Sequence, residues 1–248
     1  MVTILFLNFF SYHMRIYILQ IETSTSVCSV ALVESGQVRQ HESVDEPHVH
    51  ASRLTILIQT LLDRENIGFG DLSAIAVSMG PGSYTGLRIG VSTAKGLCYA
   101  LDIPLIAVNT LQGIYTGFRA SQAVALPYDL YIPMLDARRM EVYCTFFDHH
   151  GKVVVDTQAL IIDQTSFDPY QSQYSRICLF GPGADKLQSS FADVQGVDVI
   201  GGIETNAIDI SQIAFAKYQA GEFEDVAYFE PYYLKDFVAT TPKKRVGL

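Results

Sequence analysis

Apolar and polar residues alternate along this chain in a pattern that predicts two similar α/β units. The stretch RIYILQIET (15–23) is short, apolar and rich in β-branched residues, as expected of a buried strand. VCSVALVESG (27–36) alternates and ends at Gly36, where a hairpin turn fits, and QVRQHESV (37–44) supplies the returning strand. The same order returns in residues 130–160: an apolar strand, an acid at its end, an alternating strand, a glycine turn and another strand.

The spacing of these echoes indicates an internal duplication. Glu22 recurs 114 positions later as Asp136. Gly36 recurs 115 positions later as Gly151. A second echo follows, because AIAVSMGPGSYTG and ICLFGPGADKL each run from an apolar strand through Gly-Pro-Gly into a helix. Two β-β-β-α-β copies in the same order predict an α/β, actin-like (ASKHA) duplicated fold, with two lobes that each have a mixed sheet and flanking helices.

The two copies also suggest lobe boundaries. We expect residues 14–117 to form the first lobe, which residues 225–248 could complete, and residues 118–224 to form the second. Residues 1–13 are apolar, but they lack the basic region of a signal peptide and are too short to cross a bilayer. Met14 precedes a clean first strand, so we interpret 1–13 as a non-native extension; a short membrane-seeking tail is the alternative.

Two amphipathic helices are predicted from apolar residues that recur every three or four positions. In residues 50–66, Ile56 lies off the apolar stripe, which indicates that the opposite side is not simply solvated. Residues 206–223 form the other helix, which we expect to pack within the second half of the chain. The stripe of the first helix consists of Leu54, Leu57, Ile58, Leu61 and Leu62.

A third helix, residues 85–102, contains an unusual row of small residues. Gly86, Gly90 and Ala94 recur every four positions, and Ser92, Thr93 and Gly96 lie near them. A glycine inside a helix costs roughly 1 kcal/mol relative to alanine, so the row needs a structural reason. Small residues allow another backbone to approach closely. That backbone belongs either to the protein's own lobe or to a helix of a second protein.

The segment SMGPGSYTGLRIG (78–90) at the start of this helix looks like a phosphate-binding loop. The P-loop motif needs a lysine after its last glycine, but here Gly86 is followed by Leu87 and Arg88. The dinucleotide motif GxGxxG also fails, because the glycines are one position too far apart. The start of a helix and close packing are therefore favoured over anion binding.

The acids that end the two first strands are candidates for nucleotide binding. In actin-like proteins, such acids help to place metal and phosphate, and amides of the adjacent hairpin contact the phosphates. In a purely structural interpretation, Glu22 is bonded to amides of its own turn, and Asp136 forms an ion pair with the arginines that follow it. The nucleotide-binding candidates are Glu22, Thr23, Ser24, Thr25 and Asp136.

The composition narrows the functional classes. Of the 248 residues, 49% are hydrophobic and 17% charged, and the net charge of −9 argues against a protein that grips nucleic acid by itself. The four cysteines form no CxxC pair, which favours reduced thiols in a cytoplasm over a zinc site or disulfide framework. The pairs His48/His50 and His149/His150 lack a third ligand nearby and are interpreted as exposed pairs.

Several motifs together resemble the TsaB (YeaZ) family. ILQIETSTSVCSVAL, MGPGSYTGLRIGVSTAKGL, IPLIAVNTL, LDARRMEVY, FGPGADK and EPYYLKDFVAT follow one another between residues 15 and 237. The resemblance implies a bacterial cytoplasmic protein in the pathway that puts threonylcarbamoyl on adenosine 37 of tRNA. It also implies a non-catalytic partner of the catalytic paralogue TsaD, joined by the ATPase TsaE, that can form homodimers and meets tRNA only through the complex.

In this family, pairing uses helices of the first lobe, here at about 50–65 and 85–100. No metal, cofactor or membrane contact is expected, although ATP or ADP held at the interface of the assembled complex stays open. The expected partner-binding residues are Leu54, Ile56, Leu57, Ile58, Leu61, Gly86, Gly90, Thr93, Ala94 and Leu97.

The resemblance to TsaD stops at the catalytic metal site. TsaD-like proteins have a pair of histidines four residues apart after the corresponding strand, where this chain has Thr110 and Ile114. Within the TsaB family, the chain departs at Glu22, where Asp is common, and at Tyr84, where Phe is usual. We therefore expect a scaffold subunit. An actin-like ATPase or kinase that uses Glu22 and Asp136 is the alternative, and a peptidase would need a site that the sequence lacks.

Overall fold

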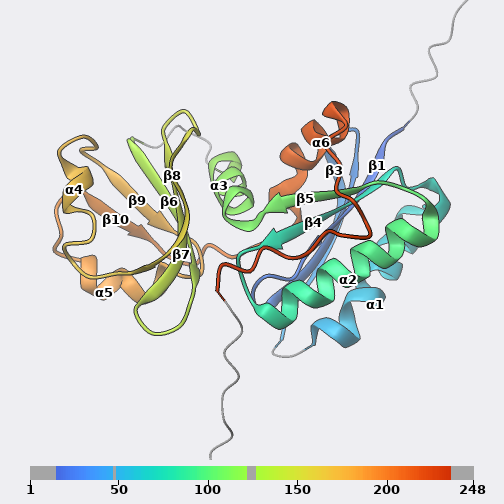
Figure 1. Cartoon of the computed structure of the whole chain (residues 1–248), viewed down its shortest axis with the longest axis horizontal. Coiled ribbons are helices and arrows are strands. Elements are labelled where there is room, and N and C mark those ends of the chain that lie inside the picture. Colours follow the sequence, from blue (N-terminus) through green and yellow to red (C-terminus); the bar gives the residue numbers. More distant parts are fainter. Residues whose placement is uncertain (1–14, 47–48, 122–126, 236–248) are drawn as a thin grey trace, which may run out of the picture.

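The computed structural model describes residues 15–46, 49–121 and 127–235 of the chain. They form two lobes that lie side by side, each built on one five-stranded sheet (Figure 1). The predicted extension 1–13 and the position of His48 lie outside the described residues. No helix in the described part of the chain is long and apolar enough to cross a membrane.

The first sheet has the strand order β3-β2-β1-β4-β5. Strands β1, β2 and β3 pair antiparallel, and β1, β4 and β5 pair parallel. Parallel strands need a crossover, and α2 connects β4 to β5 in this way. The strands are β1 (Tyr17–Glu22), β2 (Val27–Glu34), β3 (Gln37–Asp45), β4 (Ala74–Gly80) and β5 (Leu105–Asn109).

The second sheet repeats this topology in the order β10-β9-β6-β7-β8. Strands β6, β7 and β8 pair antiparallel, and β6, β9 and β10 pair parallel, as β1 does with β4 and β5. The strands are β6 (Leu130–Asp136), β7 (Glu141–Asp148), β8 (Val153–Ile161), β9 (Ile177–Phe180) and β10 (Val197–Ile200). The predicted duplication and the actin-like α/β class are thus confirmed.

The hairpin turns form where the glycine spacing predicts them. Ser35 and Gly36 both have a positive φ, of 47° and 85°, between β2 and β3. This conformation matches the twist of the two strands it connects and is favourable for glycine. Gly151, with φ of 84°, takes the equivalent place between β7 and β8.

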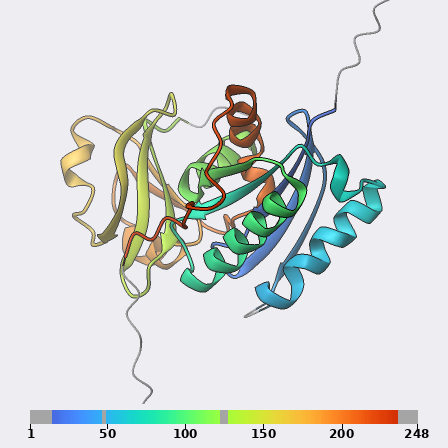
Figure 2. The ribbon, with the colours of Figure 1, turned by 45° about the vertical axis from the view of Figure 1, so that its right-hand side comes forward.

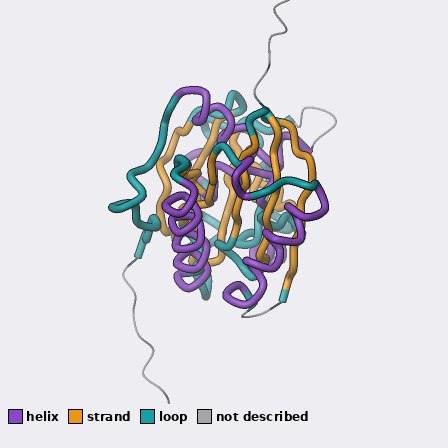
Figure 3. The backbone as a smooth tube through the Cα atoms, turned by 90° about the vertical axis from the view of Figure 1, so that its right-hand side faces the viewer, coloured by secondary structure: helices purple, strands orange, loops and turns teal. Residues whose placement is uncertain are grey.

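The helices flank the faces of the sheets (Figure 3), and α3 lies between the lobes (Figure 1). The longest two, α1 (His50–Glu65) and α2 (Tyr84–Leu101), cover the face of the first sheet that carries Leu19 and Ile21. Figure 2 shows both helices on this side. The short helices α4 (Asp168–Gln171) and α5 (Gln188–Phe191) belong to the second lobe.

The helix α3 (Thr110–Ser121) connects the lobes. Its residues Ile114 and Phe118 pack on the second sheet, while its start contacts β4 and β5 of the first. Gly113 and Gly117 let α3 approach the segment before α6 closely, because a Cβ at either position would meet Ile210 or Asp209. The two sheets are therefore joined by packed helical elements rather than by a free linker.

The helix α6 (Ser211–Ala220) packs on the first sheet. Ala214 and the preceding Ile210 form a core cluster with Ile18 of β1 and Ile106 of β5. The expectation that this helix packs within the second half is therefore wrong. Its apolar spacing predicts a buried face, but the sheet it covers comes from residues about 100 to 190 positions earlier in the chain.

Candidate functional site

The two acids at the ends of β1 and β6 have the same local geometry. Glu22 Oε1 accepts a hydrogen bond from the Ser24 backbone N at 2.5 Å. Asp136 Oδ1 accepts one from the Arg138 backbone N at 3.0 Å. In each case the carboxylate holds the turn that follows its strand by bonding the amide two residues on. The duplication therefore extends to the hydrogen bonds of these turns.

The surroundings of the two acids differ. Glu22 is 2% exposed, and burial raises the pKa of its carboxyl despite the hydrogen bond from the Ser24 backbone N. Asp136 is exposed and forms an ion pair with Lys186. Lys186 Nζ also donates to the Glu141 carbonyl oxygen at 2.7 Å, which fixes the ammonium beside Asp136.

The expected ion pair between Asp136 and the arginines that follow it is wrong. Arg138 offers Asp136 its backbone N–H, and no salt bridge of either Arg138 or Arg139 is present among the described residues. Both arginines have a positive φ, of 72° and 54°. Asp136 therefore stabilises the backbone turn that follows it by a hydrogen bond, and it does not pair with the charges of the two arginines.

The turn after Glu22 is occupied by contacts within the chain. Thr23 Oγ1 donates to the Gly86 carbonyl oxygen at 2.8 Å, and the Ser83 backbone N donates to the Ser24 carbonyl oxygen at 2.7 Å. Thr25 and Thr205 hydroxyls lie 2.7 Å apart. The turn residues predicted to bind nucleotide therefore hold α2 and the segment before α6. Whether they also bind a nucleotide stays a prediction.

The inner row of small residues on α2 packs against this same turn. A Cβ at Gly86 would collide with the Thr23 carbonyl oxygen, and one at Gly90 would collide with Thr23 Oγ1. In the loop before α2, a Cβ at Gly82 would lie 2.6 Å from the Ser24 carbonyl oxygen. Of the two explanations for these glycines, close packing within the lobe accounts for Gly86 and Gly90.

Burial divides the ten residues predicted to bind a partner. Ile56 of α1 is 52% exposed, and Leu57, Thr93 and Leu97 are partly exposed. The other six residues are buried within the lobe: Leu54, Ile58, Leu61, Gly86, Gly90 and Ala94. They therefore cannot supply side-chain contacts to a second protein. The residues that remain accessible keep their partner-binding role as a prediction.

A second row of small residues lies on the outer face of α2. Ser92, Gly96 and Ala100 are exposed, and a Cβ at Gly96 would meet no atom within 4 Å. The sequence shows Ser92 and Gly96 near the row of Gly86, Gly90 and Ala94, but it does not separate them as a second row that includes Ala100 and faces outward. We define the outer face of α2 as Ser92, Thr93, Gly96, Leu97 and Ala100.

Residues 222–235, which we call the C-terminal strap, bind along the other side of α2. Lys95 Nζ of α2 donates to the Phe229 carbonyl oxygen at 2.7 Å. The Tyr232 backbone N donates to the Met79 carbonyl oxygen at 2.7 Å. At its end the strap reaches the second lobe, where Lys235 pairs with Glu141. The strap thus connects α2 to the second lobe.

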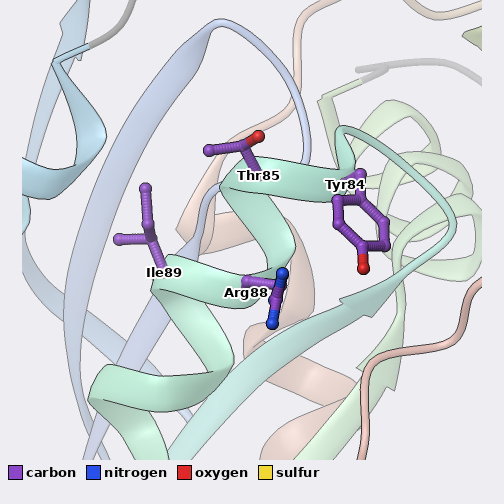
Figure 4. A pocket seen from close by; sticks show the side chains of 4 residues that line it. All are labelled: Tyr84, Thr85, Arg88 and Ile89. Atoms are coloured by element: carbon purple, nitrogen blue, oxygen red, sulfur yellow. The ribbon is translucent and has the colours of Figure 1, made fainter. Parts of the chain in front are cut away.

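An aromatic and cationic cluster forms where the strap passes the first turns of α2. The ring centroids of Tyr84 and Tyr233 are 4.7 Å apart, and the Arg88 guanidinium lies 5.3 Å from the centre of the Tyr84 ring. Beside it is a pocket of about 420 Å³ lined by Tyr84, Thr85, Arg88 and Ile89. Figure 4 shows that all four side chains come from the first turns of α2.

Core side chains occupy Thr110 and Ile114, the positions where the sequence resemblance to TsaD-like proteins places two histidines. Thr110 and Ile114 are buried in α3, and Thr110 Oγ1 accepts a hydrogen bond from the Gly80 backbone N at 3.2 Å. Both histidine pairs of this chain are expected from the sequence to be exposed. His149 and His150 are exposed, but His50 is buried on α1, so the expectation is wrong for His50. Within the described ranges, no group of three His, Cys, Asp or Glu side chains could hold a metal ion.

Comparison with known proteins places this geometry in a family. A sequence model of the TsaD family, described as tRNA N6-adenosine threonylcarbamoyltransferase, matches residues 46–169. The protein named tRNA threonylcarbamoyladenosine biosynthesis protein TsaB of Escherichia coli is 30% identical, over 90% of this chain and 96% of its own length. The TsaB protein of Bacillus subtilis is 34% identical, over 59% of this chain and 63% of its own length.

A solved structure supports the same assignment. YeaZ from Pseudomonas aeruginosa has a TM-score of 0.75 with this structure at 25% sequence identity, over 88% of this chain and all of that one. Sequence and fold therefore agree over most of the chain. This chain belongs to the TsaB (YeaZ) family.

Proposed function

We propose that this chain is a non-catalytic scaffold subunit in the formation of threonylcarbamoyladenosine at position 37 of tRNA. The names of its curated relatives support the pathway, because the full-length relative is a tRNA threonylcarbamoyladenosine biosynthesis protein. A TsaD-like catalytic paralogue is the proposed direct partner, and a TsaE-like ATPase joins the pair. On this proposal, tRNA reaches the chain only through the complex, and the protein acts in the cytoplasm without membrane contact.

The observation that carries the proposal is the outer face of α2. It offers small side chains and an open Gly96, and the neighbouring helix α1 carries the exposed Ile56. A helix of another protein can come close to such a surface, and no strand or helix of the described chain covers it. A second copy of this chain would fit the same face, so a homodimer and the heterodimer compete for it.

Two further observations support a role without catalysis. Thr110 and Ile114 are core residues that offer no imidazole at the position of the paralogue's metal ligands. Glu22 is buried and already holds its own turn. The matching turns at Glu22 and Asp136 favour the alternative function, an actin-like ATPase or kinase, because in that class these acids face the nucleotide.

The binding test uses the purified chain and the TsaD-like paralogue from the same cell. We expect Gly96→Trp to weaken their association at least about tenfold, because a bulky side chain would fill the space a partner helix needs. Ser189→Trp, at an exposed helical position of the second lobe, is the matched control and leaves the affinity unchanged. Equal affinities of the Gly96→Trp variant and the wild-type chain would place the interface elsewhere.

The catalytic test separates the scaffold from the ATPase. The purified chain alone is expected to show no appreciable ATP turnover and no transfer of threonylcarbamoyl to tRNA. Turnover that disappears in Glu22→Ala or Asp136→Ala would overturn the scaffold assignment. Glu224→Ala, which removes an acid of the strap, is the control and should leave any ATP turnover unchanged.

A further inference from the structure

The pocket beside Tyr84 and Arg88 has the chemistry of a site for one negative charge. Arg88 is exposed, and none of the ion pairs among the described residues involves it. The other pocket residues are two neutral hydroxyl-bearing side chains and Ile89. When a partner covers this surface, water is excluded around the guanidinium, and a carboxylate placed against it forms a stronger pair than on an open surface.

The cluster behind the pocket holds Arg88 in place. Tyr233 packs on Tyr84 with a tilt of 34° between the rings, and the guanidinium of Arg88 lies over the Tyr84 ring. Tyr233 itself is anchored by the strap, since Tyr232 bonds β4 and Lys95 bonds the Phe229 carbonyl oxygen. An arginine that is already ordered loses less side-chain entropy when it binds.

The position of the pocket identifies the kind of partner. It is continuous with the outer face of α2, because Ile89 precedes Thr93 and Leu97 by whole helical turns on the same side. We propose that Arg88 receives an aspartate or glutamate side chain of the catalytic paralogue, at the edge of the helix contact. This inference rests on the proposed function and adds the charge pair that sets partner specificity there.

Charge and surroundings favour a carboxylate of a protein over other anions. A nucleic acid requires a row of cations to displace its counterions, but the face next to Arg88 is neutral and the chain has a net charge of −9. Protein interfaces, by contrast, combine arginine and tyrosine with small and apolar residues. Burial raises the pKa of the Tyr233 hydroxyl, and Glu230 of the strap is close enough to raise it further, but Glu230 forms no ion pair with Arg88 among the described residues.

The first experiment measures the affinity of nucleotide-free chain for nucleotide-free paralogue by calorimetry. We expect Arg88→Glu to weaken binding about 30-fold or more, since it sets two carboxylates against each other. Arg88→Lys keeps the positive charge but lacks the planar guanidinium. We expect its affinity to lie between that of the wild-type chain and that of Arg88→Glu. Lys152→Glu makes the same charge change on an exposed turn of the second lobe and leaves the affinity within about twofold.

A second variant tests the packing that orders Arg88. Tyr233→Leu keeps the charge but removes the ring behind Tyr84, and we expect it to weaken binding about 3- to 10-fold. Thermal melting of each variant checks that the chain is folded; Arg88 is exposed, so its replacement leaves the melting temperature close to that of the wild type. Affinity of Tyr233→Leu equal to that of the wild type would contradict the positioning role of the strap.

Charge reversal identifies the partner residue. Each exposed Asp or Glu on the paralogue's contact face is changed to Lys in turn, and one of these variants is expected to bind Arg88→Glu better than the wild-type paralogue does. Unchanged affinity of Arg88→Glu while Gly96→Trp abolishes binding would overturn this inference and keep the proposed function. A loss in Arg88→Glu that arises only when ATP or ADP is present would assign the pocket to a phosphate instead. A wild-type chain that does not bind the paralogue would overturn both.

Discussion

Thr23 and Gly86 are in direct contact: the Thr23 hydroxyl donates to the Gly86 carbonyl oxygen at 2.8 Å, and the Thr23 carbonyl oxygen occupies the space that a Cβ on Gly86 would need. This contact ties the first turn of α2 to the turn after β1. It explains why a helix tolerates glycine at this position, and it shows that the inner face of α2 is not available to a partner.

We expect Gly86→Ala to destabilise the chain by about 1–3 kcal/mol, because the added methyl group meets backbone that cannot move without breaking the Thr23 bond. Gly96→Ala is the matched control in the same helix. A Cβ there meets no atom within 4 Å, and alanine is the better helix former by roughly 1 kcal/mol, so this variant is as stable or more so. Urea unfolding measures both. A Gly86→Ala variant as stable as the wild type would contradict the packing described.

The attachment of the segment before α6 to the first sheet depends on a buried hydrogen bond. Ser29 Oγ of β2 accepts a bond from the Ala207 backbone N at 2.9 Å, and both residues are fully buried. Ser29→Ala leaves this N–H without a partner, which we expect to cost about 1–3 kcal/mol of unfolding free energy. Ser43, the cross-strand neighbour of Ser29, is exposed, so Ser43→Ala should change it by no more than about 0.5 kcal/mol. Equal losses of unfolding free energy in Ser29→Ala and Ser43→Ala would show that the hydrogen bond between Ser29 and Ala207 does not stabilise the fold.

Asp209 is expected to make the chain less stable as the pH rises. Burial raises the pKa of its carboxyl from 3.8 to about 7, opposed by a hydrogen bond from the Asn206 backbone N and reinforced by the nearby Glu22. Between these two values the folded chain binds the proton and the unfolded chain does not, so raising the pH through this window favours unfolding. Above about pH 7 the carboxyl is ionised in both states, so Asp209 causes no further loss of unfolding free energy.

Urea unfolding at several pH values between 5 and 8 tests this dependence. Asp209→Asn, which keeps an oxygen to accept the Asn206 bond, should remove part of the decline. The part due to Glu22, whose pKa burial also raises, should remain. The prediction would be wrong if the unfolding free energies of the wild type and of Asp209→Asn both increased in parallel from pH 5 to pH 7. Asp209 would then ionise freely in the folded chain.

The four thiols are expected to react slowly in the folded protein. Burial raises the pKa of Cys28 and Cys98 to about 11 and that of Cys144 to about 12, and it raises the pKa of Cys178 as well. Since the thiolate is the reactive form, a rise of about two units lowers its share roughly 100-fold, before access is considered. Labelling with a thiol reagent at pH 8, with and without denaturant, measures the difference. Rapid labelling of any cysteine in the native protein would contradict its burial.

Local sequence features account for the strands and turns of both lobes. Residues 16–21 are apolar at every position except Gln20, because β1 is buried on both faces, between the α1–α2 layer and α6. The turn at Ser35 and Gly36 needs two positive φ angles, which few residue pairs adopt easily. These are short-range requirements, so one sequence reveals them, and their recurrence 114 to 115 positions later reveals the duplication.

The candidate site was only partly predictable, because spacing along a helix does not say which side faces the core. Gly86, Gly90 and Ala94 have the same period as Ser92, Gly96 and Ala100, and both rows suit a close contact. Only the position of Thr23 decides that the first row is buried and the second exposed. The place of the C-terminal strap, with Tyr233 against Tyr84, carries no local signal at all.

The sequence by itself determined the succession of strands and helix along each half, the hairpins, the duplication and the family, because each depends on neighbouring residues or on a repeated pattern. Tertiary structure alone decided that Asp136 pairs with Lys186, fifty positions away, that α6 covers the first sheet, and which face of α2 stays open. These outcomes depend on where distant segments meet, and in a chain with apolar or small residues on several helix faces, the packing of the whole fold selects among them.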